Sequence, residues 1–284
     1  MTAKPRQTVS ARRVRRELLP SQSVELLKAL HLVTRDGQLN ADALRKLKQV
    51  NHLVGLLQPG LEDVWERHPE PVVVDVGSGN AYLGFILYEL FFKDRPNGDL
   101  ISVESRPELS ERAQTRATEL KYARMRFRPQ SIAEAEYPER IHLLTALHAC
   151  DTATDDALVV ALRCKAEHVA LVPCCQAEVA QQLKDVRPKL TEPMQALFAH
   201  SWHRREFGSH LTNVIRALVL EANGYQVTVT ALTGWEHSLK NELILARKVH
   251  RENREARARL DALLESTGVR PKVIRQLEAA GSLA

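Results

Sequence analysis

Short apolar runs alternate with longer amphipathic stretches through the middle of the chain. Five of these runs are rich in β-branched or apolar residues and have the length of strands: PVVVDVG, DLISVES, RMRFRP, RIHLLTALHA and HVALVPCC. The stretches between them are long enough for helices. Because strands that alternate with helices usually pair in parallel, the pattern predicts an α/β fold with helices on both faces of one sheet.

The segment before the first of these strands has helical periodicity. Residues 17–66 contain two stretches with apolar positions three or four residues apart, and the second follows Asn40, a residue type that favours the N-cap. The apolar stripe of this second helix consists of Leu44, Leu47, Val50, Val54 and Leu57. We interpret residues 17–66 as a helical cap on the sheet.

The alternation breaks near the C-terminus. NVIRALVLEANGYQVTVTALTG predicts a helix closed by Asn223-Gly224 and then a strand, and a second strand, NELILARKV, follows after a short link. Two strands joined without a helix are expected to be antiparallel neighbours. A seven-stranded, mostly parallel sheet with an antiparallel terminal strand is the Rossmann-like layout of class I S-adenosylmethionine (SAM) methyltransferases. We expect this domain to span residues 67–249.

Charge is distributed unevenly along the 284 residues. The net charge is +5, but residues 1–16 carry six Lys/Arg and no acid, and residues 247–284 carry nine Lys/Arg against five Asp/Glu. We interpret residues 1–16 as a basic disordered tail and residues 250–284 as a basic helical extension. Basic ends around an acidic body favour a phosphate-rich partner such as RNA, although a solvated tail and surface helix would have the same composition.

Composition excludes several classes of protein. No apolar run approaches the roughly 20 residues of a membrane-spanning helix, and the basic N-terminus is not followed by the apolar segment of a signal peptide. Four cysteines, two of them adjacent, do not form the pattern of a secreted disulfide framework. We therefore expect a cytoplasmic protein without a membrane partner.

A glycine-rich turn follows the first strand of the alternating region. In DVGSGNAYLG, Gly77 and Gly79 allow a sharp turn and close approach of a ligand to the backbone. Tyr82 stands where a dinucleotide site would have a third glycine or an alanine. The form found here, with Asp75, Gly77, Ser78 and Gly79, resembles SAM sites, in which the amino-acid end of the cofactor occupies the turn.

Later strands supply the remaining candidate cofactor contacts. The second strand ends at Glu104, whose carboxylate can accept hydrogen bonds from both ribose hydroxyls of an adenosyl ligand; an acid that merely ends a strand is the alternative. After the third strand, Gln130, Ser131 and Ile132 fall where an adenine ring would rest. With His148 after the fourth strand, these positions complete the expected SAM site.

The fourth strand ends in groups that can do chemistry. Ligands of an open α/β sheet lie at the carboxyl ends of its strands, so His148, Cys150 and Asp151 should point toward the methyl donor. His148 and Asp151 are our candidates for a base that takes a proton from the acceptor, and a structural role for His148 is the alternative. We expect Asp155 to cap the next helix together with Thr154.

Cys174 and Cys175 close the fifth strand, near the expected position of Cys150. Four roles are open: a nucleophile like the cysteine that attacks pyrimidine rings, a zinc site with His148, a redox pair, or lining of the acceptor pocket. The spacing does not match a zinc knuckle, and vicinal cysteines form a strained disulfide that a reducing compartment disfavours. We expect the three cysteines to line the acceptor pocket, and we expect no metal.

The pattern His-x-Cys-x-x-Ala-Thr-Asp-x-Ala-Leu, from His148 to Leu158, resembles a branch of the class I methyltransferases, and so does the Cys174-Cys175 pair. The branch includes the tRNA acceptor-stem ribose 2′-O-methyltransferases and the methyltransferase-like domain of a glutathione S-transferase C-terminal-domain-containing protein. The resemblance covers roughly residues 40–248. It implies a SAM-dependent methyltransferase, for which we favour RNA (tRNA or rRNA) as the substrate. A protein or small-molecule acceptor, or a SAM fold that binds without catalysis, are the alternatives.

Two further segments are candidates for substrate contact. FAHSWHRREFGSH, expected between the fifth strand and the next helix, combines Trp202 with Arg204 and Arg205, groups that suit base stacking and phosphate contact. In WEHSLKNE, the link between the last two strands, Lys240 or Asn241 can reach the acceptor. A solvated loop and an ordinary polar turn are the alternatives.

Overall fold

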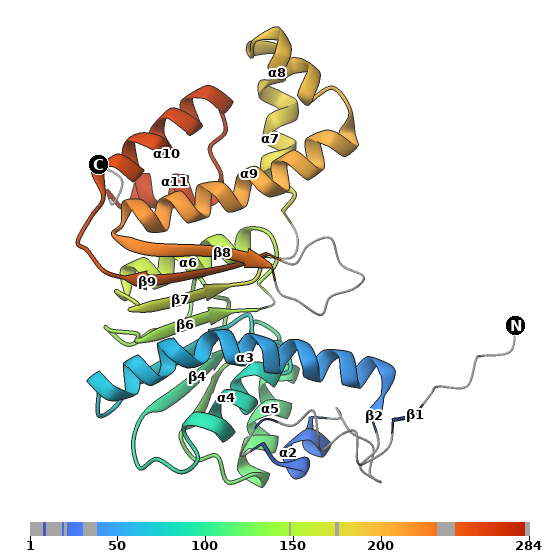
Figure 1. The fold of residues 1–284 in the computed structure, drawn as a ribbon, viewed down its shortest axis with the longest axis vertical. Helices are drawn as coiled ribbons and strands as arrows, with labels where there is room; N and C mark the ends of the chain where they lie inside the picture. Colours follow the sequence, from blue (N-terminus) through green and yellow to red (C-terminus); the bar gives the residue numbers. More distant parts are fainter. Residues whose placement is uncertain are drawn as a thin grey trace, which may run out of the picture.

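Seven strands form one sheet in the order β5-β4-β3-β6-β7-β9-β8 in this computed structural model (Figure 1). The strands are β3 (Val72–Val76), β4 (Asp99–Val103), β5 (Met125–Arg128), β6 (Leu143–Ala146), β7 (His168–Leu171), β8 (Tyr225–Ala231) and β9 (Glu242–Lys248). The strands β3 to β7 pair in parallel, and β9 pairs antiparallel with both β7 and β8. The predicted class I methyltransferase fold is confirmed. The structure describes residues 8–9, 19, 22–30, 39–147, 149–173, 176–231 and 242–281.

Helices cover both faces of this sheet (Figure 1). They are α2 (Val24–Ala29), α3 (Ala41–Arg67), α4 (Tyr82–Phe91), α5 (Pro107–Glu119), α6 (Thr152–Arg163), α7 (Glu178–Val186), the 3₁₀ helix η1 (Arg187–Lys189), α8 (Glu192–Leu197), α9 (Ser201–Ala222), α10 (Arg254–Thr267) and α11 (Lys272–Ala279). None of the described helices combines the length and apolar character needed to cross a membrane.

The two faces follow from the alternation of side chains along each strand. Val73 and Ala170 point to the face covered by α2 to α5, where they join one apolar cluster. Their neighbours Val74 and Val169 point to the other face and pack with α6, α7, α9, α10 and α11. Because both faces are covered, the inner strands β3, β6 and β7 are apolar at most positions, which is why they stand out in the sequence.

The predicted N-terminal cap is largely the long helix α3. Leu47, Val54 and Leu57 are buried, as the apolar stripe predicted. Of the predicted basic tail, the structure describes only Thr8–Val9, which form the short strand β1 and pair with β2 (Leu39–Asn40). The other residues of segment 1–16 lie outside the described part of the chain.

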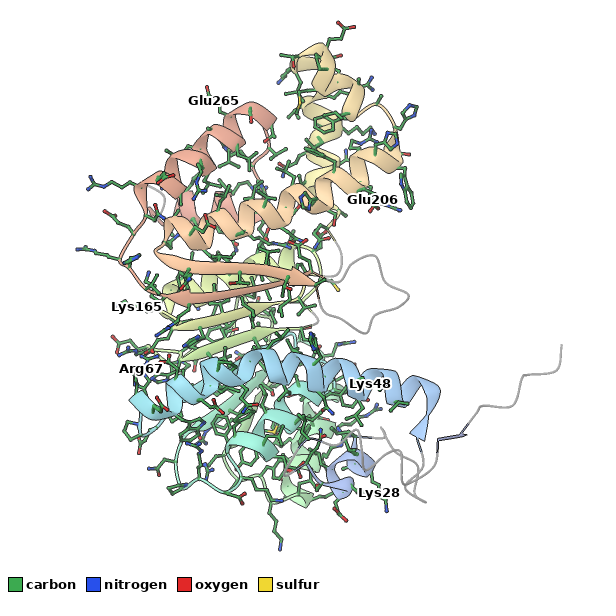
Figure 2. The ribbon with its side chains drawn as sticks, viewed as in Figure 1. Lys28, Lys48, Arg67, Lys165, Glu206 and Glu265 are labelled. Carbon is green, nitrogen blue, oxygen red and sulfur yellow. The ribbon has the colours of Figure 1, made fainter. Side chains whose placement is uncertain are left out.

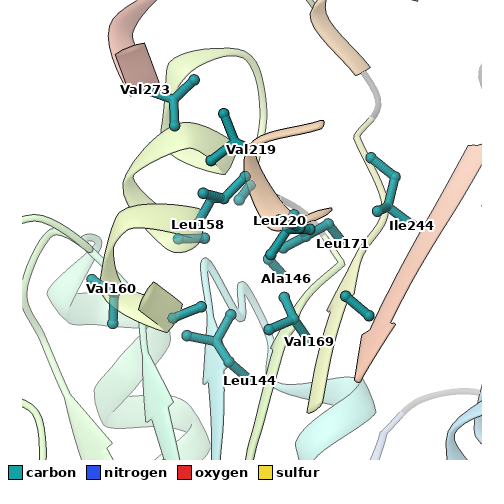
Figure 3. Packing of buried hydrophobic residues seen from close by; sticks show 14 of the residues in the cluster. Leu144, Ala146, Leu158, Val160, Val169, Leu171, Val219, Leu220, Ile244 and Val273 are labelled. Atoms are coloured by element: carbon teal, nitrogen blue, oxygen red, sulfur yellow. The ribbon is translucent and has the colours of Figure 1, made fainter. Parts of the chain in front are cut away.

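The C-terminal segment is an integral part of the domain core. Figure 3 shows Val273 of α11 packed near Val219 of α9 and Leu158 of α6, and all three are buried. Several basic residues of this segment pair with acids of the domain: Lys272 with Asp156 at 2.7 Å, Arg275 with Glu178 at 2.7 Å, and Arg259 with Glu221 at 2.9 Å. These cations are therefore engaged within the fold, which makes the extension a weaker candidate for a phosphate-binding surface.

A buried carboxylate joins α3 to the sheet at the edge opposite the strands' carboxyl ends. Glu167 accepts from the guanidinium groups of Arg67 and Arg140, both at 2.5 Å, and lies 2.9 Å from Nε2 of His68; Figure 2 shows Arg67 on α3. Burial opposes ionisation of Glu167, but hydrogen bonds from His68 and Arg67 outweigh it and hold its pKa below the ordinary value. The cluster therefore contains an ionised glutamate shared by three cationic or hydrogen-bonding partners.

His68, His142 and Glu167 also bring metal-ligand atoms within 4.8 Å of one another. The backbone N–H of Val72, however, donates to Nδ1 of His142 at 2.9 Å. A neutral imidazole with an occupied Nδ1 lone pair carries its proton on Nε2, so neither ring nitrogen is available to a metal. The contacts of these residues are those of a structural ion-pair cluster.

We predict that Glu167→Gln destabilises the protein at pH 7, because the ion pairs of the carboxylate are lost. The loss should be only about 1 kcal/mol, since both arginine partners are partly exposed. A depressed pKa stabilises the fold above the unfolded-state pKa, and this stabilisation is lost as pH falls through the folded-state pKa. The difference in unfolding free energy between variant and parent should therefore shrink below about pH 4.5. Urea unfolding from pH 7 to pH 4 measures it, with exposed Glu70→Gln as control. A difference that grows toward low pH would contradict this account.

Candidate active site

The predicted cofactor-binding and catalytic residues that the structure describes gather at the carboxyl ends of the parallel strands, whereas Arg204 and Arg205 lie on α9. Because β6 lies between β3 and β7, the loop after β6 adjoins both the glycine-rich turn after β3 and the residues after β7. The contact with the turn is close: Gly77 has φ +62°, and a Cβ placed on it would lie 3.3 Å from Cα of Ala149. A side chain at Gly77 would therefore displace the loop after β6.

The glycine-rich turn is fixed to β4 through its backbone. The N–H of Ser78 donates to O of Val103 at 3.1 Å, and the N–H of Gly79 donates to Oε2 of Glu104 at 2.7 Å. Gly79 has φ +58°, and the described atom nearest to a Cβ there is a guanidinium nitrogen of Arg106 at 3.8 Å. The turn thus presents backbone to open space, as the binding of a cofactor at this position requires.

Glu104 is a buried carboxylate with strong donors. Its Oε1 accepts from Nε of Arg106 at 2.7 Å and from the Arg106 backbone N–H at 3.1 Å. Burial alone would raise the pKa of Glu104, but the hydrogen bonds from Arg106 and Gly79 lower it below the ordinary value. An ionised carboxylate beside the turn is a strong acceptor for hydroxyl groups, so the geometry suits the predicted contact with a ribose.

Asp75 lies beneath the turn and is 2% exposed. Burial, together with the charge of Glu104, raises the pKa of Asp75 to about 7, although Thr145 donates a hydrogen bond to it at 2.8 Å. No cation of the described residues pairs with this carboxylate. The ammonium group at the amino-acid end of SAM would supply such a cation, so the residues around the turn fit the cofactor.

The candidate adenine contacts follow β5, next to β4 in the sheet. The hydroxyl of Ser131 donates to Oε2 of Glu134 at 2.6 Å, and the side chain of Ile132 is 8% exposed. The carbonyl of Ile132 accepts from the hydroxyl of Tyr137 at 2.9 Å. Ile132 therefore offers an apolar contact from a fixed backbone, whereas the polar group of Ser131 is already engaged.

Asp151 ties the loop after β6 to the start of α7. Its Oδ1 accepts from the backbone N–H of Ala177 at 3.0 Å and from that of Glu178 at 3.5 Å. Its own backbone has φ +50°, an uncommon conformation for a residue other than glycine. The structure gives Asp151 a positioning role, and its action as a base stays a prediction. Cys150 is exposed beside it.

The prediction that Asp155 caps the next helix was wrong. The helix α6 begins at Thr152, so Asp155 lies within its first turns and points into the core. Oδ1 of Asp155 accepts from Nε of Arg216 at 2.7 Å, and Oδ2 accepts from the backbone N–H of Val273 at 3.3 Å. Both charged side chains are 1% exposed. Thr154 instead donates to the carbonyl of Ala149.

Arg216 was not among the predicted site residues. Besides Asp155, its guanidinium donates to the carbonyl of Asp151 at 2.7 Å and to Oδ1 of Asn213 at 3.2 Å. The signal in the sequence is a single cation within NVIRALVL, on the apolar face of a predicted helix, because a charge at such a position requires a buried partner. Arg216 connects the loop after β6 to helix α9.

The segment FAHSWHRREFGSH was expected between strand and helix, but from Ser201 onward it forms the first turns of α9. The segment contains no proline, and a helix there leaves its polar side chains exposed. Trp202 is 58% exposed, and the guanidinium of Arg205 lies 4.6 Å from the centroid of its ring. Arg204 instead donates to the carbonyl of Phe198 at 3.0 Å.

A cavity of about 520 Å³ lies beside these first turns of α9. Its walls come from α9, from the residues after β7, and from the facing ends of β8 and β9. The lining residues are Pro173, Gln176, Glu206, Ser209, His210, Asn213, Val229, Thr230, Ala231 and Glu242. The cavity and the glycine-rich turn thus lie on opposite sides of the loop after β6.

Five predicted site residues lie outside the described part of the chain: His148, Cys174, Cys175, Lys240 and Asn241. Their roles stay predictions. Their described neighbours in the sequence line the cavity: these are Pro173 and Gln176, which flank the cysteine pair, and Glu242, which follows Asn241.

The chain is similar to a family of methyltransferase domains and to part of several longer proteins. The sequence model of a family described as a methyltransferase domain matches residues 45–182. The glutathione S-transferase C-terminal domain-containing protein of Bos taurus is 27% identical over 233 residues, which covers 74% of this chain and 34% of that protein. Its Drosophila melanogaster homolog is 29% identical over 232 residues, with coverage of 72% and 37%. The chain therefore spans about a third of the length of these relatives.

Solved structures with a similar fold include two methyltransferases. The magnesium protoporphyrin IX methyltransferase of Synechocystis PCC 6803 with bound SAH is 13% identical, with a TM-score of 0.44 and coverage of 78% of this chain and 94% of that one. An rRNA methylase from Streptococcus thermophilus is 11% identical, with a TM-score of 0.41 and coverage of 69% and 95%. At these identities the likeness is one of fold.

We predict that Glu104→Gln weakens SAM binding about tenfold or more, because the uncharged amide is a poorer acceptor for the ribose hydroxyls. Isothermal titration with SAM measures the dissociation constant. Glu111→Gln, an exposed substitution on α5, is the matched control and should bind SAM like the parent protein. Equal affinities of Glu104→Gln and the parent would contradict the assigned contact.

Removal of Arg216 should destabilise the domain strongly. We predict that Arg216→Met lowers the free energy of unfolding by about 3–5 kcal/mol, because the carboxylate of Asp155 stays buried without its partner. The double variant Arg216→Met/Asp155→Leu should recover part of this loss, since it leaves no unpaired charge. Urea unfolding measures both, and a cost of Arg216→Met below about 1 kcal/mol would contradict the buried pair's importance.

The site, the fold and the relatives point to the same family. An acid-x-Gly-x-Gly turn with an acid at the end of the next strand lies in a sheet of the class I order, and the family match covers the turn and this acid. The chain carries a class I SAM-dependent methyltransferase domain, related to a region that makes up about a third of the glutathione S-transferase C-terminal domain-containing proteins.

Proposed function

We propose that this methyltransferase acts on RNA, either tRNA or rRNA. The observation that carries the proposal is the exposed Trp202, whose ring is stacked with Arg205 on the helix that also lines the cavity. An aromatic ring next to a guanidinium suits a base and its phosphate, and proteins that bind single-stranded RNA combine these two groups. The six cations of residues 1–16 support the same class of partner.

In this proposal the glycine-rich turn binds the amino-acid end of SAM, with Asp75 beneath it and Glu104 at the ribose. Gly77, Ser78 and Gly79 supply the backbone of the turn, and Ser131, Ile132 and His148 complete the site. SAM supplies an activated methyl group. The protein has to align the acceptor atom with that group, a task of proximity and orientation.

The acceptor enters from the side of α9 and β9. Asp151 holds the loop after β6 against α7, which fixes the wall between cofactor and acceptor. A proton on the acceptor atom would be taken by His148 or Asp151, the two candidates at this loop. The predicted substrate contacts belong to this side: Cys150, Cys174, Cys175, Arg204, Arg205, Lys240 and Asn241.

The test is transfer of tritium from methyl-labelled SAM to total RNA taken from cells that lack the protein. We predict that label enters RNA and that Trp202→Ala lowers the transfer about fivefold or more, because one stacked base is lost. SAM affinity should not change. Arg254→Ala, which removes an exposed arginine of α10, is the control and should label RNA like the parent protein. Label found in protein and not in RNA would contradict the proposal.

A further inference from the structure

The cavity beside α9 has an acidic lining. Of the ten described residues that line it, Glu206 and Glu242 are carboxylates, and none is lysine or arginine. A phosphate or carboxylate inside it would meet like charge, whereas a group rich in N–H donors would be attracted. The arginine that could bind a phosphate, Arg205, belongs to the stacked pair with Trp202 and does not line the cavity.

Glu242 is held in place by a chain of buried amides. The side chain of Asn213 donates to Oε2 of Glu242 at 3.0 Å, and Oδ1 of Asn213 accepts from Gln176 at 3.3 Å and from Arg216 at 3.2 Å. Ser209 donates to Oε1 of Gln176 at 2.5 Å. Asn213 and Gln176 are each 3% exposed. The orientation of both amides is therefore fixed, and a hydrogen-bond donor is directed at the carboxylate.

This arrangement leaves Glu242 with acceptor capacity toward the cavity. An ionised carboxylate has about four lone-pair positions, and the Asn213 amide occupies one of them. Glu206, by contrast, lies 3.6 Å from the guanidinium of Arg205 and is partly neutralised by it. Glu242 is thus the better placed of the two carboxylates to bind a donor pair from a ligand.

Among the RNA bases, guanine presents two adjacent donors, N1–H and the 2-amino group, on its Watson–Crick edge, which match the two oxygens of one carboxylate. Inosine lacks the 2-amino group and keeps only one of these donors. The volume of about 520 Å³ is within the usual range for a small-molecule or nucleoside site.

We propose that the cavity binds a guanine base of the RNA substrate, with the carboxylate of Glu242 accepting from N1–H and the 2-amino group. The inference rests on the proposed RNA methyltransferase function and adds the base that is recognised. Trp202 and Arg205 then contact the neighbouring base and phosphate at the entrance. Glu242, held by Asn213, is the residue that determines specificity.

The test compares two synthetic trinucleotides, ApGpA and ApIpA, by isothermal titration against the full chain in the presence of S-adenosylhomocysteine. The parent protein should bind ApGpA about tenfold more tightly than ApIpA. Glu242→Gln should bind both with the same weak affinity, because the amide presents one acceptor and one donor where guanine needs two acceptors. Glu265→Gln, an exposed substitution on α10 (Figure 2), should keep the parent's preference.

Two outcomes would overturn the inference. Equal binding of ApGpA and ApIpA by the parent protein is one, and tighter binding of acetyl-arginine amide, a protein-like donor group, is the other. Failure of the RNA function would look different: the guanine preference and its loss in Glu242→Gln would remain, but no label would pass from SAM to RNA. Unchanged SAM affinity of Glu242→Gln, measured in parallel, shows that the variant is folded.

Discussion

The buried ion pair between Arg216 and Asp155 is the interaction on which the arrangement of the site depends. Both side chains are 1% exposed, so neither charge can be solvated if the other is lost. The same guanidinium contacts the carbonyl of Asp151 and the amide of Asn213. One residue of α9 thereby positions the loop between cofactor and acceptor and, through Asn213, the carboxylate of Glu242.

This network also explains why the C-terminal helices belong to the domain. The backbone N–H of Val273 donates to the second oxygen of Asp155. Helix α11 therefore supplies a donor to the same buried carboxylate that pairs with Arg216. Leu158 and Val219, each three residues after one partner of the pair, are fully buried in one apolar cluster (Figure 3). A low local dielectric strengthens each of these bonds and makes the loss of any one of them costly. The acceptor side of the site thus depends on packing of the chain's last helices.

On the cofactor side, two carboxylates have different surroundings and therefore different pKa values. Glu104 is held ionised by Arg106 and by the backbone of the glycine-rich turn, whereas Asp75 has a pKa near 7 because it is buried without a cation. Two carboxylates of opposite tendency thus lie on either side of one turn. The first suits the ribose hydroxyls of SAM, and the second suits the ammonium group at its amino-acid end.

The fold could be predicted from the sequence because both faces of the sheet are buried. In the run from Val72 to Val76 every residue except Asp75 is valine, and Asn223-Gly224 ends α9 as expected. The partners of Asp155 could not be predicted, since Arg216 and Val273 are distant in sequence and are brought together only by the packing of α6, α9 and α11. The first turns of α9 could not be distinguished from a connection, because polar exposed residues have the same pattern in a helix end and in a loop.

We propose that this domain methylates RNA, and mass spectrometry of RNA nucleosides is the direct test. Total tRNA and rRNA from cells that lack the protein are compared with RNA from cells that overproduce it. The account predicts one methylated nucleoside that is absent from the first sample, enriched in the second, and restored to the deficient cells by the parent protein but not by Glu104→Gln. Identical nucleoside profiles in all samples would contradict the claim.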